Sequence, residues 1–255
     1  MTEPMDESLK QAQLCCPVVE LRQYTLHPGK RDVLIELFDR EFVESQEALG
    51  IKVIGQFRDL DSPDRFVWLR GFRDMNSRAK ALSDFYGGPV WKKHREAANA
   101  TMIDSDNVLL LRPALSTSGF SLENLKWPPE GSDEVPRNLI VATVYYFERS
   151  VPPDFINFFE HTLKPVATSL GATITAYFVT ETSENTFPAL PVREGENVFV
   201  WFSTFQDSAA HENYVTALSQ SERWRNEVSA GLMRYLDRAP EVLKLSPTAR
   251  SLLRD

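Results

Sequence analysis

The sequence predicts an α+β fold in which two tandem ferredoxin-like units form a barrel within one chain. Each half shows the expected order strand, helix, two strands, helix and strand, which is the ferredoxin-like pattern. Each four-stranded sheet then carries helices on one face only, so the sheet of the other half is expected to cover its bare face. The halves also match at landmark residues, which pair as Tyr24 with Tyr145, Gly50 with Gly171, Trp68 with Trp201, Phe72 with Phe205, Asp74 with Asp207 and Trp91 with Trp224. These matches favour a duplication over chance.

The expected elements of the first half are strands over 18–26, 51–58, 65–72 and 108–112 and helices over 31–49, 75–86 and from 89 onward. The opening strand alternates between two faces and ends at His27-Pro28-Gly29, because proline lacks the N–H that a sheet ladder uses. Apolar residues at helical spacing predict the first helix, and Gly50 ends it. Asp74 is placed to cap the second helix.

The expected elements of the second half are strands over 138–147, 172–180, 197–205 and 241–245 and helices that begin after Pro152, Asp207 and Ser221. Pro165 lies inside the first of these helices and predicts a kink near Lys164. Matching residues of the two halves are 121 positions apart at Gly50 and Gly171 but 133 positions apart at Trp68 and Trp201. The hairpin of the second half therefore contains an insertion of 12 residues. The resulting loop, 181–196, is long for a hairpin and is expected to be a lid, a contact surface or a tolerated insertion.

The predicted divisions are a disordered tail over 1–16, a unit over 17–113, a linker over 114–137, a unit over 138–246 and a C-terminal tail over 247–255. The linker is not expected to be free, because Phe120, Leu122, Leu125 and Trp127 would otherwise expose apolar area. The adjacent cysteines, Cys15 and Cys16, are expected to be free thiols, because neighbouring residues rarely reach disulfide geometry.

The opening strand and the corner after it carry a family resemblance. The stretch Glu20-Leu21-Arg22-x-Tyr24-Thr25-Leu26-x-Pro28-Gly29-Lys30 is similar to the start of a NIPSNAP domain. That family belongs to the dimeric α+β barrel superfamily, which implies ferredoxin-like units whose sheets pair into a barrel. The resemblance covers 17–113 well and 138–246 more faintly, because the second half lacks the E-L-R-x-Y opening. It implies a role related to the cofactor-independent monooxygenases of the superfamily, or a binding and scaffolding role.

Composition argues against several classes of partner. The net charge of -8 and the pI near 5.2 repel phosphate, which argues against nucleic-acid and acidic-membrane partners. No apolar run approaches the ~20 residues that cross a bilayer, and the first residues resemble neither a secretion signal nor a transit peptide. A cytoplasmic protein is therefore expected. The sequence predicts no cofactor and no metal site, and it leaves room for a homo-oligomer.

Charged and aromatic residues gather on one face of the predicted sheet. We assume that the most apolar face of each strand packs against the helices, so that the other face points into the barrel interior. In the first half this interior face carries Glu20, Arg22, Tyr24, Gln56, Arg58, Trp68 and Arg70. The matching positions of the second half are Val141, Thr143, Tyr145, Tyr177, Val179, Trp201 and Ser203. Guanidinium groups suit carboxylate or enolate oxygens, so a polar lumen is expected to bind a small anionic or aromatic molecule. The expected ligand-binding residues are Arg22, Arg58, Trp68, Arg70, Tyr145, Tyr177 and Trp201, and the expected acid or base is Glu20 or Tyr24. The alternative is a set of cross-strand ion pairs that needs no ligand.

Three functions remain open on the sequence. The first is a small-molecule protein, related to cofactor-independent monooxygenases, that works in the lumen. The second is a non-enzymatic interaction module that works through the loop 181–196 and the linker. The third is a haem-binding barrel that uses His161 or His211, because chlorite dismutase-like relatives in the superfamily ligate haem through a helix histidine.

Overall fold

The computed structural model describes residues 15–123 and 125–254. The first half contains β1 (Val18–Leu26), α1 (Arg31–Leu37), η1 (Phe38–Phe42), α2 (Val43–Glu47), β2 (Lys52–Asp59), β3 (Arg65–Phe72), α3 (Met75–Gly87), α4 (Pro89–Asn99) and β4 (Met102–Pro113). The second half contains β5 (Leu139–Phe147), α5 (Pro153–Phe158), η2 (Phe159–Leu163), α6 (Lys164–Ser169), β6 (Thr173–Thr180), β7 (Asn197–Phe205), α7 (Ser208–Gln220), η3 (Trp224–Ser229), α8 (Ala230–Leu232) and β8 (Glu241–Pro247).

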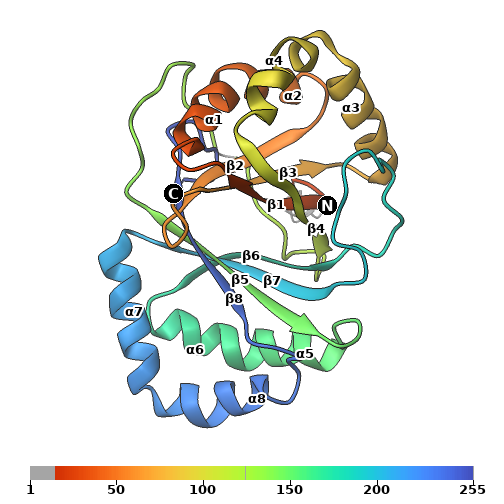
Figure 1. Cartoon of the computed structure of the whole chain (residues 1–255). Helices are drawn as coiled ribbons and strands as arrows, with labels where there is room; N and C mark the ends of the chain where they lie inside the picture. The colour runs from red at the N-terminus through yellow and green to blue at the C-terminus, as the bar shows by residue number, and fades with distance from the viewer. Residues whose placement is uncertain (1–14, 124, 255) are drawn as a thin grey trace, which may run out of the picture.

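The strands close into one antiparallel barrel with the order β1-β3-β2-β8-β5-β7-β6-β4. In the sheet of the first half β1 lies between β4 and β3, and in that of the second half β5 lies between β8 and β7. The two sheets join where β2 pairs with β8 and where β4 pairs with β6. The helices of the first half cover one side of the barrel and those of the second half cover the opposite side (Figure 1). The predicted fold, two ferredoxin-like units forming an intrachain α+β barrel, is confirmed.

Local signals in the sequence explain where the helices begin. The Asp74 carboxylate accepts a hydrogen bond from the Ser77 amide at 2.6 Å, and the Asp207 carboxylate accepts one from the Ala210 amide at 2.8 Å. Both caps were predicted. The irregularity predicted near Lys164 is present, since the π-helical η2 ends there. Its counterpart η1 contains no proline, however, so proline alone does not cause the π-helical turn.

The interior of the barrel is apolar. All eight strands contribute to one buried cluster, represented by Val19, Leu21, Phe57, Leu69, Leu109, Ile140, Phe178, Val200 and Leu245. The predicted polar lumen is therefore wrong, and the strand faces are reversed. The charged face of β1 lies against helices α1 to α4, and the aliphatic face points inward. Alternation could not reveal this, because eight of the nine residues in β1 and all nine in β5 are buried, so both faces exclude water.

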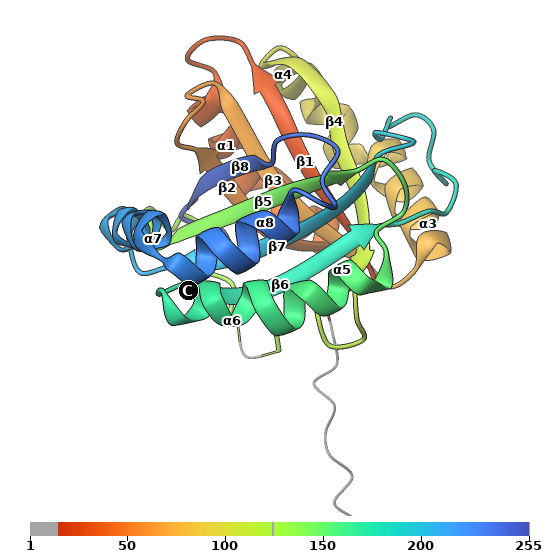
Figure 2. The same ribbon diagram turned by 90° about the horizontal axis from the view of Figure 1, so that it is seen from below.

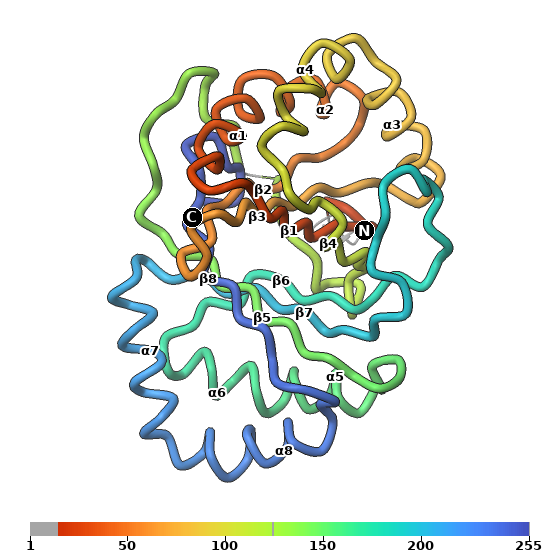
Figure 3. Tube along the Cα trace, in the orientation of Figure 1, coloured from red at the N-terminus to blue at the C-terminus, as the bar shows by residue number. Residues whose placement is uncertain are grey.

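Segments outside the strands complete the core. Phe120 and Leu122 of the linker are buried in the barrel cluster, and Leu125 and Trp127 pack against it, as the sequence predicted. The linker then runs beside α1 before it enters β5 (Figure 3). The residues after β8, placed in a C-terminal tail by the sequence, are packed: Leu252 and Leu253 are buried, and the Leu253 amide donates to the Ile54 carbonyl at 2.8 Å.

The two cysteines differ from expectation. Cys15 and Cys16 are joined by a disulfide, so the prediction of free thiols is wrong. Cys16 belongs to the barrel cluster, which places it against apolar side chains. The rest of the predicted disordered tail, 1–14, lies outside the described residues. Within the part of the chain that the structure covers, none of the helices has both the length and the apolar character needed to cross a membrane.

Candidate functional site

A buried group of four charged side chains lies between the sheet and the helices of the first half. We call Glu20, Arg22, Arg70 and Arg78 the arginine cluster. Glu20 Oε2 lies 2.6 Å from Arg22 Nη1 and 2.7 Å from Arg70 Nε, and Glu20 Oε1 lies 2.6 Å from Arg78 Nε. The side chains of all four are at most 1% exposed. One carboxylate thus holds three guanidinium groups that come from β1, β3 and α3.

The arginine cluster carries excess positive charge. Glu20 is the only described carboxylate that forms an ion pair with Arg22, Arg70 or Arg78. Arg70 Nη2 and Arg78 Nη2 are buried and have no hydrogen-bond partner among the described residues. Uncompensated buried charge is costly in a protein interior. The cluster is therefore complementary to a further negatively charged group, which residues 15–123 and 125–254 do not supply.

The charges fix the protonation of the cluster. Burial alone would raise the pKa of Glu20, but attraction to Arg70, Arg22 and Arg78 holds that pKa well below its usual range. Glu20 is thus ionised, and both its oxygens are occupied, so it is poorly suited to act as the general base that the sequence suggested. Burial raises the pKa of Tyr24, whose hydroxyl oxygen accepts a hydrogen bond from Arg22 Nε at 2.9 Å. Tyr24 therefore keeps its proton and can donate it in a hydrogen bond.

A small aromatic cavity adjoins the cluster. It has a volume of about 30 Å³ and is lined by Tyr24, Leu34, Phe38, Phe42, Gln46, Trp68, Phe85, Tyr86, Trp91, Ala98 and Met102. Tyr24, Gln46 and Tyr86 connect the two features: Tyr24 bonds Arg22, while Gln46 Oε1 and the Tyr86 hydroxyl each lie 3.4 Å from Arg70 Nη1. Trp68 is buried, and its Nε1 has no partner among the described residues. The cavity therefore offers aromatic faces beside unpaired donors.

The π-helical turn η1 contributes directly to this cavity. Phe38 and Phe42 both come from it, and the Phe38 ring packs 4.8 Å from the Trp68 ring. Such turns frequently occur at functional sites, because they change which side chains face inward. The first half therefore brings a charged group and an aromatic cavity into one sheet-helix layer.

The comparisons with known proteins fit this architecture. The NIPSNAP family model matches residues 19–117. Residues 19–117 thus form a NIPSNAP domain. The matched region contains the whole arginine cluster and every residue that lines the aromatic cavity. None of the curated proteins compared with the chain matches it.

Solved structures extend the likeness to the second half. A "putative monooxygenase" from Fusobacterium nucleatum aligns with a TM-score of 0.53 and 10% identity over 91% of this chain and 93% of that chain. An anthrone oxidase-like protein aligns with a TM-score of 0.54 and 15% identity over 91% of each chain. A NIPSNAP-like domain protein from Burkholderia xenovorans shares 26% identity over 38% of this chain and 84% of that chain, with a TM-score of 0.35. At these identities, the two longer alignments establish the barrel fold alone.

Five of the predicted site residues meet in the NIPSNAP domain. These are Glu20, Arg22 and Arg70 in the arginine cluster and Tyr24 and Trp68 at the aromatic cavity. They lie in the helix layer, where the sequence analysis did not place them. Arg78 was missed altogether. A signal for it existed, because Arg78 shares the buried face of α3 with Leu82 and Phe85, where a charged residue is unusual.

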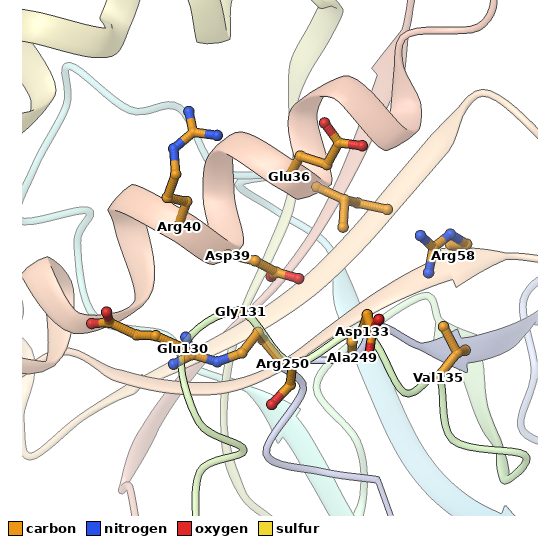
Figure 4. A pocket seen from close by; sticks show the side chains of 12 residues that line it. Glu36, Asp39, Arg40, Arg58, Glu130, Gly131, Asp133, Val135, Ala249 and Arg250 are labelled. Atoms are coloured by element: carbon orange, nitrogen blue, oxygen red, sulfur yellow. The ribbon is translucent and has the colours of Figure 1, made fainter.

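Arg58 does not join the cluster. It pairs with Asp32 at 2.8 Å and lines a separate, open groove of about 630 Å³. Figure 4 shows this groove between α1, the linker and the C-terminal segment, with Asp39 and Arg250 on its walls. Gln56 is buried beside this groove, since its amide nitrogen is 3.3 Å from Oδ1 of Asp39, a lining residue. The sequence analysis named Arg58 together with Arg22 and Arg70, but the third arginine of the buried cluster is Arg78.

The aromatic residues predicted in the second half lie on the opposite side of the barrel. Tyr145, Tyr177 and Trp201 belong to the sheet-helix layer of that half, where Tyr177 and Trp201 pack against Phe159 with ring distances of 4.9 and 5.9 Å. At the positions equivalent to Glu20, Arg22 and Arg70 this layer has Val141, Thr143 and Ser203. It therefore lacks the arginine cluster, and the two predicted linings do not face each other.

The histidines named for haem also lie in the second half. His161 is exposed, and His211 is half-buried against Phe205, with a ring distance of 5.0 Å. Burial lowers the pKa of His211. No group of three or more His, Cys, Asp or Glu residues in 15–123 and 125–254 is arranged to hold a metal ion. Haem binding stays a prediction.

Proposed function

We propose that the NIPSNAP domain binds a small planar anion, with its charge at the arginine cluster and its ring in an enlarged aromatic cavity. The observation that carries the proposal is the imbalance of three buried guanidinium groups on one carboxylate, with unpaired nitrogens on Arg70 and Arg78. Charge-assisted, bidentate hydrogen bonds to a carboxylate or enolate are the strong contacts that guanidinium groups make. Trp68 and Tyr86 supply faces on which a ring can pack.

We further propose chemistry like that of a cofactor-independent monooxygenase. Positive charge fixed in a site that excludes water stabilises an enolate or phenolate, which favours loss of a proton from the substrate. The protonated Tyr24 can hold the oxygen on which that charge develops. The electron-rich anion then reacts with O2. In this scheme Glu20 orients the guanidinium groups, solvent takes the proton that the substrate loses, and Tyr24 stays protonated as a hydrogen-bond donor to the substrate oxygen.

Salicylate tests the binding proposal, because salicylamide is a neutral probe of almost the same shape. Calorimetric titration should show that salicylate binds and that salicylamide binds at least about tenfold more weakly, as expected for a charge-assisted contact. Arg70→Gln should weaken salicylate binding by a similar factor. Arg58→Gln is the matched control, because Arg58 lies in the separate groove. Equal affinities for salicylate and salicylamide would contradict the proposal that the arginine cluster binds an anion.

Oxygen uptake tests the proposed chemistry. Anthrone is the first substrate to try, since one structural neighbour is an anthrone oxidase-like protein. Anthrone and O2 give anthraquinone and water with atoms balanced, so oxygen consumption and quinone absorbance should rise together. Tyr24→Phe should slow both, whereas Arg58→Gln should leave both unchanged. Oxygen consumption no faster than in buffer alone would contradict the proposed oxidation and leave only the binding proposal.

A further inference from the structure

The inserted loop of the second half reaches the site of the NIPSNAP domain. Figures 1 and 2 both show the connection between β6 and β7 beside α3. Asn185 Oδ1 accepts a hydrogen bond from Arg78 Nη1 at 2.9 Å, and Thr186 Oγ1 lies 3.3 Å from the same nitrogen. The Phe187 ring stacks on Tyr86 at 5.9 Å with an angle of 24° between the rings. A segment of the second half thus touches both the arginine cluster and a wall of the aromatic cavity.

The loop lies outside the cavity and packs on Arg78 and on Tyr86, which is one wall of the cavity. Its ends are fixed to β4, since the Glu181 amide donates to the Leu110 carbonyl at 2.8 Å and the Arg193 amide donates to the Val108 carbonyl at 2.9 Å. Between these anchors the loop contains no helix or strand. The walls of the cavity themselves belong to strands paired within the barrel and to helices packed on them. Movement between the two anchors therefore breaks contacts such as that of the Thr186 hydroxyl with the Met75 carbonyl, at 3.1 Å, but no helix and no strand pairing.

The cavity needs such movement. A volume of about 30 Å³ is close to that of a single water molecule. A ring-containing anion cannot enter unless a wall is displaced. Displacement of the loop would also release Arg78 Nη1, which now bonds the neutral Asn185 amide oxygen beside the unpaired Nη2. Both nitrogens would then be free to bind one anionic group.

We infer that residues 185–190 form a lid over the NIPSNAP site. In the closed state the Asn185 amide oxygen binds Arg78 at the position that the anionic group of the ligand would take. Phe187 limits the size of the ligand. This inference rests on the proposed function, and it makes the site depend on both halves of the chain. The two residues act as positioning and specificity residues and take no part in bond breaking.

Asn185→Ala tests the competition for Arg78. Removing the amide oxygen takes away the closer of the two loop acceptors of Arg78 Nη1, since Thr186 Oγ1 is 3.3 Å away. Salicylate should therefore bind about tenfold more tightly, the value of one hydrogen bond to a charged group. A purely structural role predicts the opposite, because a disturbed loop would weaken binding. The matched control is Asn107→Ala, since Asn107 Oδ1 lies 3.3 Å from Nη1 of Arg193 at the base of the loop. It should loosen the loop without tightening binding.

Phe187→Ala tests the limit on ligand size. The affinity for 3-hydroxy-2-naphthoate relative to salicylate should rise by about tenfold, because Tyr86 loses the ring that stacks on it and can move to make room for the second ring. Phe158→Ala, a half-buried phenylalanine in the helix layer of the second half, is the matched control and should leave the ratio unchanged.

The outcomes separate the lid from the site. The lid would be overturned, and the proposed function left standing, by either of two results. In the first, Asn185→Ala and Phe187→Ala leave salicylate binding unchanged. In the second, both variants weaken it without changing the affinity for 3-hydroxy-2-naphthoate relative to salicylate. Failure of wild-type protein and both variants to bind either probe would overturn the proposed function and the lid together.

Discussion

Arg78 Nε on α3 lies 2.6 Å from Glu20 Oε1 on β1, although the two residues are 58 positions apart in the chain. This buried contact ties the helix layer of the NIPSNAP domain to its sheet. It also fixes the geometry of the site, because the same carboxylate holds Arg22 and Arg70 through its other oxygen. Stability and the proposed ligand recognition therefore depend on the same side chains.

Glu20→Gln should be strongly destabilising. The change leaves three buried guanidinium groups without a carboxylate, and breaking a buried ion pair typically costs about 3–5 kcal/mol. Urea denaturation measures the loss. The control is Asp32→Asn, which removes the exposed partner of Arg58 and should cost less than about 1 kcal/mol. A Glu20→Gln protein as stable as wild type would show that the cluster is not held by this carboxylate.

The same carboxylate predicts a loss of stability in acid. The pKa of Glu20 is depressed in the folded state, because attraction to the three arginines outweighs burial. Its contribution is therefore fully present above the ordinary pKa of 4.5 and decreases as the pH falls below that value. Unfolding midpoints measured between pH 7 and pH 3 should fall more steeply for wild type than for Glu20→Gln. Parallel curves would contradict the assignment.

Asp39 predicts a pH effect of opposite sign. Burial raises the pKa of Asp39 from 3.8 to about 6. The folded state therefore binds the proton more tightly, so the ionised carboxylate lowers stability as the pH rises from about 4 to about 6. Asp39→Asn should stabilise the protein at pH 8 by on the order of 2 kcal/mol. The gain should disappear near pH 4, and a gain that is constant with pH would exclude titration as its cause.

Tyr24→Phe should destabilise the protein even though it removes a single oxygen. Arg22 Nε donates to that oxygen at 2.9 Å, and a buried charged donor left without an acceptor costs about 1–3 kcal/mol. Tyr214→Phe is a suitable control, because burial alone raises the pKa of Tyr214 and no charged partner contributes. Chemical denaturation of both variants gives the comparison. Equal losses would show that the Arg22 contact has no special weight.

Deletion of residues 248–255 should destabilise the barrel by about 3 kcal/mol or more, because burial of a leucine contributes about 1.5–3 kcal/mol. Leu252 and Leu253 would be lost from the core, together with the hydrogen bonds to the Gln56 and Ile54 carbonyls. Leu252→Ala isolates the packing effect from the change in length. Leu60→Ala, at a residue that is 47% exposed, should have little effect. An unchanged urea midpoint after the deletion would contradict this role of the C-terminal segment.

The site was only partly predictable from the sequence. The E-L-R-x-Y opening drew attention to Glu20, Arg22 and Tyr24, and the sequence analysis grouped Arg70 with them; the structure brings these four side chains together. Arg78 was missed because the predicted site was restricted to strands, although a charge on the apolar face of α3 was visible. Asn185 carried no local signal, because its role depends on where a long loop folds back in space.

Local chemistry in the sequence determined the order of the elements, the caps at Asp74 and Asp207, and the family of the first half, because each depends on residues close together in the chain. Only the tertiary structure decided which strand face points inward. Strands β1 and β5 bury side chains on both faces, so alternation gives the same pattern for either choice. The opening strand faces the helices with its charged side because α3 brings Arg78 to Glu20, a contact set by packing across the fold.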